Sequence, residues 1–155
     1  MKKLLLITLA LMLVISCSTS RQIERAVSVG NFDQAITDAL GKLRNNKNKK
    51  RKAEYIVMLQ EAYVKANERD INDINFMTKD GNPENFIKIY DLYSDLEQRQ
   101  QRIQPLLPLY VNDKKVRFDM RDYSNKIITS KDKASLHLYT NARAVLNNTN
   151  NSKMD

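Results

Sequence analysis

Cysteine, histidine, glycine and proline are all scarce in this sequence, and each shortage excludes a class of site or fold. Among 155 residues there are one cysteine, one histidine, three glycines and three prolines. A single cysteine cannot form an intramolecular disulfide or a thiolate metal site, and a single histidine cannot supply a histidine-rich metal set. The sequence has no glycine-rich phosphate loop and no serine in a nucleophile elbow. We therefore expect no metal site and no cofactor, and we predict that the protein is not an enzyme.

The acidic residues and the single histidine do not form a catalytic pattern either. Asp70 and Asp73 lie three residues apart, as do Asp119 and Asp122, but neither pair has a supporting histidine or glycine-rich loop. We interpret both pairs as parts of solvated helix faces. His137 lies between two leucines on an expected helix, and we interpret it as a surface or boundary residue.

The N-terminal segment has the charge and length pattern of an export signal. Two lysines precede an apolar run from Leu4 to Ile15 that only Thr8 interrupts. About a dozen apolar residues are too few for a permanent transmembrane helix, which needs roughly 20. The pattern therefore predicts a secretion signal over residues 1–16 that is removed from the mature protein.

The four residues from Val14 to Cys17 (Val-Ile-Ser-Cys) resemble the lipobox of bacterial lipoproteins, in which an apolar residue and two smaller ones precede the cysteine. The resemblance implies that the signal is cut before Cys17, that lipid is attached to its thiol, and that an acyl chain such as palmitate is added to the new amino group. Residues 17–19 would then be the lipidated N-terminus. Two or three chains anchor a protein far more firmly than one. The alternative is an ordinary secretion signal with an incidental cysteine.

The residue after the cysteine and the net charge bear on location and partners. Ser18 stands where many lipoproteins of the inner membrane have aspartate. The resemblance therefore implies the outer membrane of a Gram-negative envelope, with the protein facing the periplasm. The formal net charge of +8 becomes +6 once a signal with two lysines and no acid is removed. In an exported protein this charge favours an anionic lipid, lipopolysaccharide phosphate or an acidic protein partner over nucleic acid.

The mature chain has the apolar spacing of a helical protein. Apolar residues recur mostly at intervals of three and four, and with so few glycines and prolines this spacing predicts an almost all-α fold. Residues 20–146 fit one helical domain, and the polar residues 147–155 are expected to form a disordered tail. A first helix should begin near Thr19 and end near Gly30, and a second should follow Asn31. These two helices are expected to form a hairpin.

Further elements are expected along the rest of the chain. A third helix should span about residues 55–66, followed by a separate shorter segment that ends before Gly81. Pro83 should begin the longest helix, in which Ile89, Leu96 and Ile103 are spaced by seven and form a seam for another helix.

The C-terminal part of the domain is expected to combine an irregular insert with a last helix. Residues 109–121 could hold two short strands about Asn112 and Asp113, or form a loop. A final helix should run from Asp122 to about Leu146. It has the pattern of the first half of a hairpin whose second helix is missing.

Two corners of the chain repeat one another. Gly30 to Ile36 aligns with Gly81 to Ile87, with glycine, asparagine, an acid, an amide and isoleucine in register. The first corner, with an aromatic residue and then an alanine after its glycine, resembles the second helix of a tetratricopeptide repeat. Over roughly residues 20–104, the resemblance implies an array of antiparallel helical hairpins that binds proteins. The corners are 51 residues apart instead of about 34, so we do not expect a regular superhelix.

One basic segment and one tyrosine are the candidate binding residues. Residues 42–52 contain seven basic side chains and no acid: Lys42, Arg44, Lys47, Lys49, Lys50, Arg51 and Lys52. Each could add about 1 kcal/mol of attraction to an anionic membrane surface. The alternative is a solvated loop between two helices. Tyr110, close to the prolines, is the candidate contact with a protein partner.

These observations favour a membrane-anchored, non-enzymatic helical scaffold that binds an envelope protein. Its membrane attachment would be the covalent lipid on Cys17. The alternative function is a cationic protein that binds an anionic envelope lipid or polymer through residues 42–52. Neither nucleic acid nor a small-molecule substrate is indicated.

Overall fold

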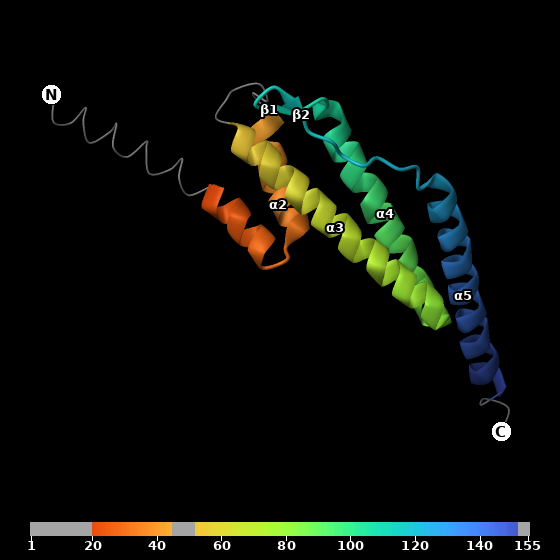
Figure 1. The fold of residues 1–155 in the computed structure, drawn as a ribbon. Coiled ribbons are helices and arrows are strands. Elements are labelled where there is room, and N and C mark those ends of the chain that lie inside the picture. The colour runs from red at the N-terminus through yellow and green to blue at the C-terminus, as the bar shows by residue number, and fades with distance from the viewer. Residues whose placement is uncertain (1–19, 45–51, 152–155) are drawn as a thin grey trace, which may run out of the picture. The chain divides into compact units, whose positions relative to one another are not determined.

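The computed structural model describes residues 20–44 and 52–151, which form helices and one small two-stranded sheet (Figure 1). The expected all-α fold is confirmed. The chain separates into two compact units. Unit 1 contains the described residues up to Asn67 together with Ile103–Asp119. Unit 2 contains Glu68–Arg102 and the described residues from Met120 onward.

Unit 1 begins with a helical hairpin. Its helices are a helix over residues 20–28 and α2 (Phe32–Arg44), joined at Gly30 as expected (Figure 1). Gly30 has φ +79°, a conformation that glycine adopts without strain. Its N–H donates to the carbonyl of Val27, and the N–H of Asn31 donates to that of Ala26. This bonding satisfies the last carbonyls of the first helix and fixes where the chain turns.

Small and branched apolar residues fill the core of unit 1. Several alanines let the helix backbones approach closely, while leucines and isoleucines fill the space between them. The buried residues come from both helices of the hairpin, from α3, from the last residue of the helix over residues 86–103 and from the connector after it: Ile23, Ala26, Val27, Ala35, Ile36, Ala39, Leu40, Leu43, Ile56, Met58, Leu59, Ala62, Tyr63, Ala66, Ile103 and Leu109.

Helix α3 (Ala53–Asp80) is continuous, whereas the sequence predicted two separate segments. That expectation was wrong because a short polar stretch after Ala66 was read as a break. No glycine or proline lies within α3, so nothing in the backbone forces an end before Gly81. The residues up to Asn67 belong to unit 1, and those from Glu68 belong to unit 2.

The connector in unit 1 contains the two short strands that the sequence allowed. After η3 (Gln104–Leu106), strand β1 (Tyr110–Val111) pairs antiparallel with β2 (Lys114–Lys115). Asn112 and Asp113, at the turn, have φ values of 48° and 61°. Asparagine and aspartate tolerate such values better than other non-glycine residues, so they suit a tight hairpin turn. Beyond β2, Phe118 packs edge-on against Tyr63, with ring centroids 5.4 Å apart.

Unit 2 contains the end of α3, the short η2 (Pro83–Asn85), α4 (Phe86–Ile103, of which Ile103 lies in unit 1) and α5 (Ser124–Asn151). The side chain of Asn82 caps the start of η2 by accepting from the N–H of Glu84 at 3.1 Å. The helix therefore begins at Pro83 as expected. It is not the longest, because α4 has 18 residues and both α3 and α5 have 28.

The core of unit 2 is much smaller. It contains the buried residues Ile74, Ile89, Leu92, Leu96 and Tyr123. The predicted seam of α4 is buried along its length: Ile89 and Leu96 lie in the core of unit 2, and Ile103 in that of unit 1.

Helix α5 is longer than the sequence suggested. Asp122 accepts a hydrogen bond from the N–H of Ser124 at 2.9 Å, which satisfies a donor at the first turn. The helix then continues to Asn151, into the polar segment 147–155 that composition predicted to be disordered. Residues 152–155 lie outside the described part of the chain.

Candidate functional site

The basic segment is only partly covered by the structure. Lys42 and Arg44 lie in the last turn of α2, and Lys52 lies just before α3. The ammonium of Lys52 donates to the carbonyl of Lys42 at 2.5 Å and lies 5.7 Å from the centroid of the Tyr55 ring. A cation at the C-terminal end of α2 is favoured by the helix dipole. Lys52 therefore joins two helix ends of unit 1.

The remaining candidates of that segment, Lys47, Lys49, Lys50 and Arg51, lie outside the described residues, as does Cys17. The structure therefore brings together Lys42 and Lys52 among the predicted contacts and describes nothing of the lipidation site. Tyr110 lies on β1 opposite Lys115, and 53% of its surface is exposed. It is accessible to a partner, as the prediction requires.

The second half of α5 carries an apolar face that no described element covers. From Tyr123, just before the helix, through its first half, buried or half-buried positions recur at intervals of three and four: Tyr123, Ile127, Ser130, Ala134 and His137. Every residue from 138 to 148 is exposed.

We call Leu138, Tyr139, Ala142 and Leu146 the α5 face. Their spacing places them within about a third of the helix circumference. Leu138 is 53% exposed, Tyr139 65% and Leu146 64%. Contiguous apolar surface of this kind is unusual on a monomer and marks contact sites.

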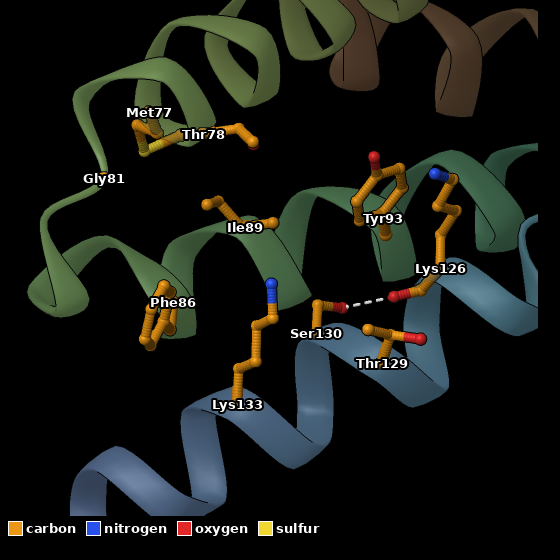
Figure 2. A pocket seen from close by; sticks show the side chains of 10 residues that line it. All are labelled: Met77, Thr78, Gly81, Phe86, Ile89, Tyr93, Lys126, Thr129, Ser130 and Lys133. Carbon is orange, nitrogen blue, oxygen red and sulfur yellow. Dashed lines mark hydrogen bonds between the residues drawn. The ribbon is translucent and has the colours of Figure 1, made fainter.

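Unit 2 also contains a cavity of about 370 Å³. Its walls come from the end of α3, the first turns of α4 and the middle of α5 (Figure 2). The lining residues are Met77, Thr78, Gly81, Phe86, Ile89, Tyr93, Lys126, Thr129, Ser130 and Lys133. Figure 2 shows the apolar and aromatic side chains on α3 and α4, while the two lysines and two hydroxyls extend from α5. Burial raises the pKa of the Tyr93 phenol above its usual value, because it disfavours the charged form.

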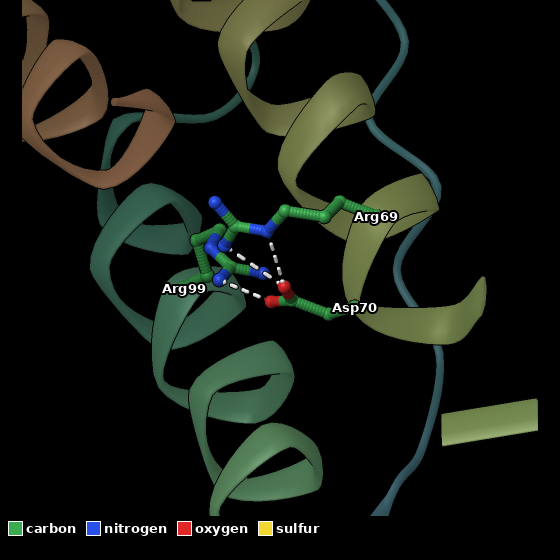
Figure 3. A network of polar contacts seen from close by, with 3 residues as sticks. All are labelled: Arg69, Asp70 and Arg99. Atoms are coloured by element: carbon green, nitrogen blue, oxygen red, sulfur yellow. Dashed lines mark hydrogen bonds and ion pairs between the residues drawn. The ribbon is translucent and has the colours of Figure 1, made fainter. Parts of the chain in front are cut away.

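A buried ion pair connects α3 and α4 within unit 2. The guanidinium of Arg99 donates to one carboxylate oxygen of Asp70 at 2.6 Å, and Arg69 donates to the other at 2.8 Å (Figure 3). The side chains of Asp70 and Arg99 are each 1% exposed. Such a pair gives little net stability over apolar residues, but removing one partner leaves an uncompensated charge. Its role is structural, since both Asp70 oxygens are already occupied.

The expectation that Asp70 lies on a solvated face was wrong. Two patterns could have found the pair. Asp70 continues the buried line Ala66, Ile74 of α3 at spacings of four, and Arg99 lies between Leu96 and Ile103 on the seam of α4. A buried ion pair is indicated when an acid lies on the apolar stripe of one helix and a base lies on the apolar stripe of another. A charged residue on one apolar stripe alone does not indicate a pair.

His137 is half-buried, and its surroundings in unit 2 are described. Its ring lies 3.2 Å from a Glu84 carboxylate oxygen and packs edge-on against Phe86, with centroids 6.1 Å apart. Asn141 lies 3.1 Å from the same ring nitrogen. The boundary position expected from the sequence is confirmed, and its contacts help to hold α5 against the start of α4.

Two other kinds of site are absent from residues 20–44 and 52–151. No three histidine, cysteine, aspartate or glutamate side chains there are grouped closely enough to hold a metal ion. No helix in this part of the chain is both long and apolar enough to cross a membrane.

The structure thus adds the α5 face and the cavity to the candidates that the sequence supplied. Comparison of the chain with protein-family models, with curated proteins and with solved structures finds no match.

Proposed function

We propose that this protein is a lipid-anchored, non-enzymatic helical scaffold of the Gram-negative outer membrane, facing the periplasm, and that its α5 face binds a protein partner. The lipobox-like sequence ending at Cys17 supports the anchor. The observation that carries the binding function is the α5 face. Beyond His137, α5 exposes large apolar side chains, Leu138, Tyr139 and Leu146, that no described element covers.

The partner that fits the α5 face is an amphipathic helix with acidic flanks. Helices bind apolar stripes of this kind through their own side chains at spacings of three, four and seven. From residue 131 to residue 148, α5 carries Lys131, Lys133 and Arg143 but only one acid, Asp132. Acidic flanks on the partner would complement this charge. A second copy of α5 would bring the same excess of positive charge, so a homodimer through this face is disfavoured.

The hairpins support a repeat-like arrangement as part of the same proposal. Within unit 1, the helix over residues 20–28 and α2 form one hairpin with a corner at Gly30. Within unit 2, the end of α3 and α4 form another with a corner at Gly81, which has φ +70°. We propose that these are tetratricopeptide-like hairpins and that the partner helix occupies the place of the return helix that α5 lacks.

The alternative, a cationic binder of anionic lipid or polymer through residues 42–52, has less support. Lys52 donates to the α2 carbonyl of Lys42. A lysine engaged in this way has a role within the fold, which agrees with a loop between helices. Lys42 and Arg44 are exposed, but basic residues in the last turn of a helix are common without any ligand.

A test of the binding site uses a photo-crosslinking residue in cells. Placed at Leu138 or Leu146, it should capture one envelope protein, and the captured peptide should be an amphipathic segment with acidic flanks. Leu136 is the matched control for Leu138, because it is a leucine of α5 that is 66% exposed and lies about 160° around the helix from Leu138. Equal capture from Leu136, or capture of a second copy of this chain from Leu138, would contradict the proposed partner.

The anchor is tested separately. Cys17→Ala should abolish lipid attachment and leave the protein either uncleaved or released from membranes, as followed by metabolic labelling with a palmitate analogue and by membrane fractionation. Normal labelling and unchanged membrane attachment of the variant would show that Cys17 is not the lipidated residue.

A further inference from the structure

We propose that the cavity in unit 2 binds a single-chain anionic amphiphile, with its apolar chain against α3 and α4 and its charged headgroup at Lys126 and Lys133 on α5. The site is separate from the α5 face, because its α5 residues lie on a different side of the helix from Leu138 and Leu146. The inference does not depend on the proposed scaffold function.

The wall formed by α3 and α4 suits a hydrocarbon chain. Ile89 is buried and Met77, Phe86 and Tyr93 are half-buried around the cavity. Figure 2 shows these side chains on the two helices that meet at Gly81, opposite the side chains of α5. Methionine adapts its shape to irregular apolar ligands, and the aromatic rings add broad contact surfaces. Ligand sites are commonly of this kind, apolar with a few polar groups that fix orientation.

The cavity volume limits the ligand to one chain of moderate length. It measures about 370 Å³, which at about 30 Å³ for each water-sized group gives room for roughly a dozen such groups. A saturated chain of about that length with a small headgroup fits, and a lipid with two long chains does not. The size is also within the range of about 300–1,000 Å³ that is typical of small-molecule sites.

The charge at the cavity selects an anion. Lys126 and Lys133 are seven residues apart, so they extend from one side of α5. No acidic residue lines the cavity, and neither lysine has an ion pair with a described residue. The ammonium of Lys133 lies 5.9 Å from the centroid of the Phe86 ring, a contact that orients the ammonium and leaves its charge in place.

The two acids on either side of Gly81 have other partners. Glu84 lies 3.2 Å from the His137 ring, and Asp80 accepts from the side-chain amide of Asn85 at 2.9 Å. Neither of these two acids therefore pairs with the lysines beside the apolar wall. A carboxylate or phosphate between the two lysines would form charge-assisted hydrogen bonds. Thr129 adds a hydroxyl at the same wall.

Carboxylate and phosphate headgroups share this chemistry, so free fatty acids and single-chain lipid phosphates are both possible sources. The test uses the full chain in phosphatidylcholine vesicles and photoreactive probes that carry one diazirine on a twelve-carbon chain. One probe ends in a carboxylate, one in a phosphate and one in a trimethylammonium group. After irradiation, the labelled residues are mapped by mass spectrometry.

We expect the two anionic probes to label residues 77–93 and 126–133, and the cationic probe to leave them unlabelled. The ratio of the two anionic signals identifies the preferred source. The double variant Lys126→Met and Lys133→Met keeps most of the aliphatic side-chain length but removes both charges. It should lower labelling by about tenfold or more, as expected from the loss of a hydrogen bond between charged groups.

Two further variants make the result specific. Lys131→Met is the matched control, because Lys131 is an exposed lysine of α5 that does not line the cavity, and it should label like the parent. Thr129→Trp should fill the cavity from its exposed wall and abolish labelling with the fold intact by circular dichroism. Equal labelling by the cationic probe, unchanged labelling in the double lysine variant, or label confined to other parts of the chain would overturn the proposal.

Discussion

Unit 1 and unit 2 share helix α3 but differ in how completely they enclose their helices. In the described part of the chain, the core of unit 1 contains sixteen buried apolar residues and that of unit 2 contains five. In unit 1, α3 packs against the helical hairpin and the connector. In unit 2, a charged pair occupies the interior between α3 and α4, and α5 is covered only over its first half. Unit 1 is built as a closed core, and unit 2 has surface available for other molecules.

The largest expected effect concerns the buried ion pair of unit 2. Asp70→Ala leaves Arg99 buried with only part of its partner set and should cost about 3–5 kcal/mol in the free energy of unfolding. The double variant Asp70→Leu and Arg99→Met removes both charges and should recover most of that loss. Urea denaturation of the two variants and the parent measures both values. A double variant as unstable as Asp70→Ala would mean that the pair itself stabilises unit 2.

The next prediction compares matched leucines in the two cores. Leu40 in unit 1 is 1% exposed and Leu92 in unit 2 is 4% exposed. Leu→Ala changes at such sites cost about 2–5 kcal/mol, and the cost rises with the cavity that remains. Because unit 1 surrounds Leu40 more completely, Leu40→Ala should lower the free energy of unfolding by an amount near the upper end of this range. Leu92→Ala should lower it by an amount near the lower end. Equal losses in urea denaturation would show that the two cores are equally well packed.

The smallest effect concerns the start of α5. Hydrogen bonds to Asp122 from the side chain and the N–H of Ser124 hold the pKa of its carboxyl below the usual value. A lowered pKa means that the charged form stabilises the folded state. This contribution is present above the unfolded pKa of about 3.9 and is lost as the pH falls through the lower folded value. Asp122 is fully exposed, so only local fraying is expected.

Nuclear magnetic resonance can check this prediction in two ways. The Asp122 carboxyl should titrate below the range of an ordinary aspartate, and Asp122→Ala should increase hydrogen exchange in the first turn of α5 at neutral pH. If the Asp122 carboxyl titrates like an ordinary aspartate, or if hydrogen exchange in Asp122→Ala equals that of the parent, then Asp122 does not stabilise the start of α5.

The sequence predicted well those features that depend on neighbouring residues. Gly30 and Asn31 marked one corner, Asn82 and Pro83 marked another, and Asn112 with Asp113 marked the hairpin turn, because each conformation is determined within a few residues. The continuity of α3 was missed because the polar residues after Ala66 look like a break, although one of them, Asp70, pairs with Arg99, which is 29 residues away. A short run of polar residues in the sequence is compatible both with a loop and with a helix that carries one member of a buried ion pair.

The candidate sites show the same division. The spacing predicted a last helix from Asp122, but only the fold shows that its apolar side chains from Leu138 onward have no described neighbour. The cavity requires side chains from three helices of unit 2, and no single stretch of sequence records that they meet. The lipobox-like residues at Cys17 and most of the basic segment lie outside the described residues, so the inferences drawn from them stay predictions.

The most direct test of the central claim, that unit 2 leaves the α5 face open for a partner, compares charged substitutions at exposed leucines within and outside that face. The double variant Leu138→Asp and Leu146→Asp should melt like the parent, because both side chains are exposed, yet lose the envelope protein that photo-crosslinking identifies. Leu136→Asp should melt like the parent and keep that protein. A double variant that unfolds at a much lower temperature, or that keeps its partner at the parental level, would contradict the account.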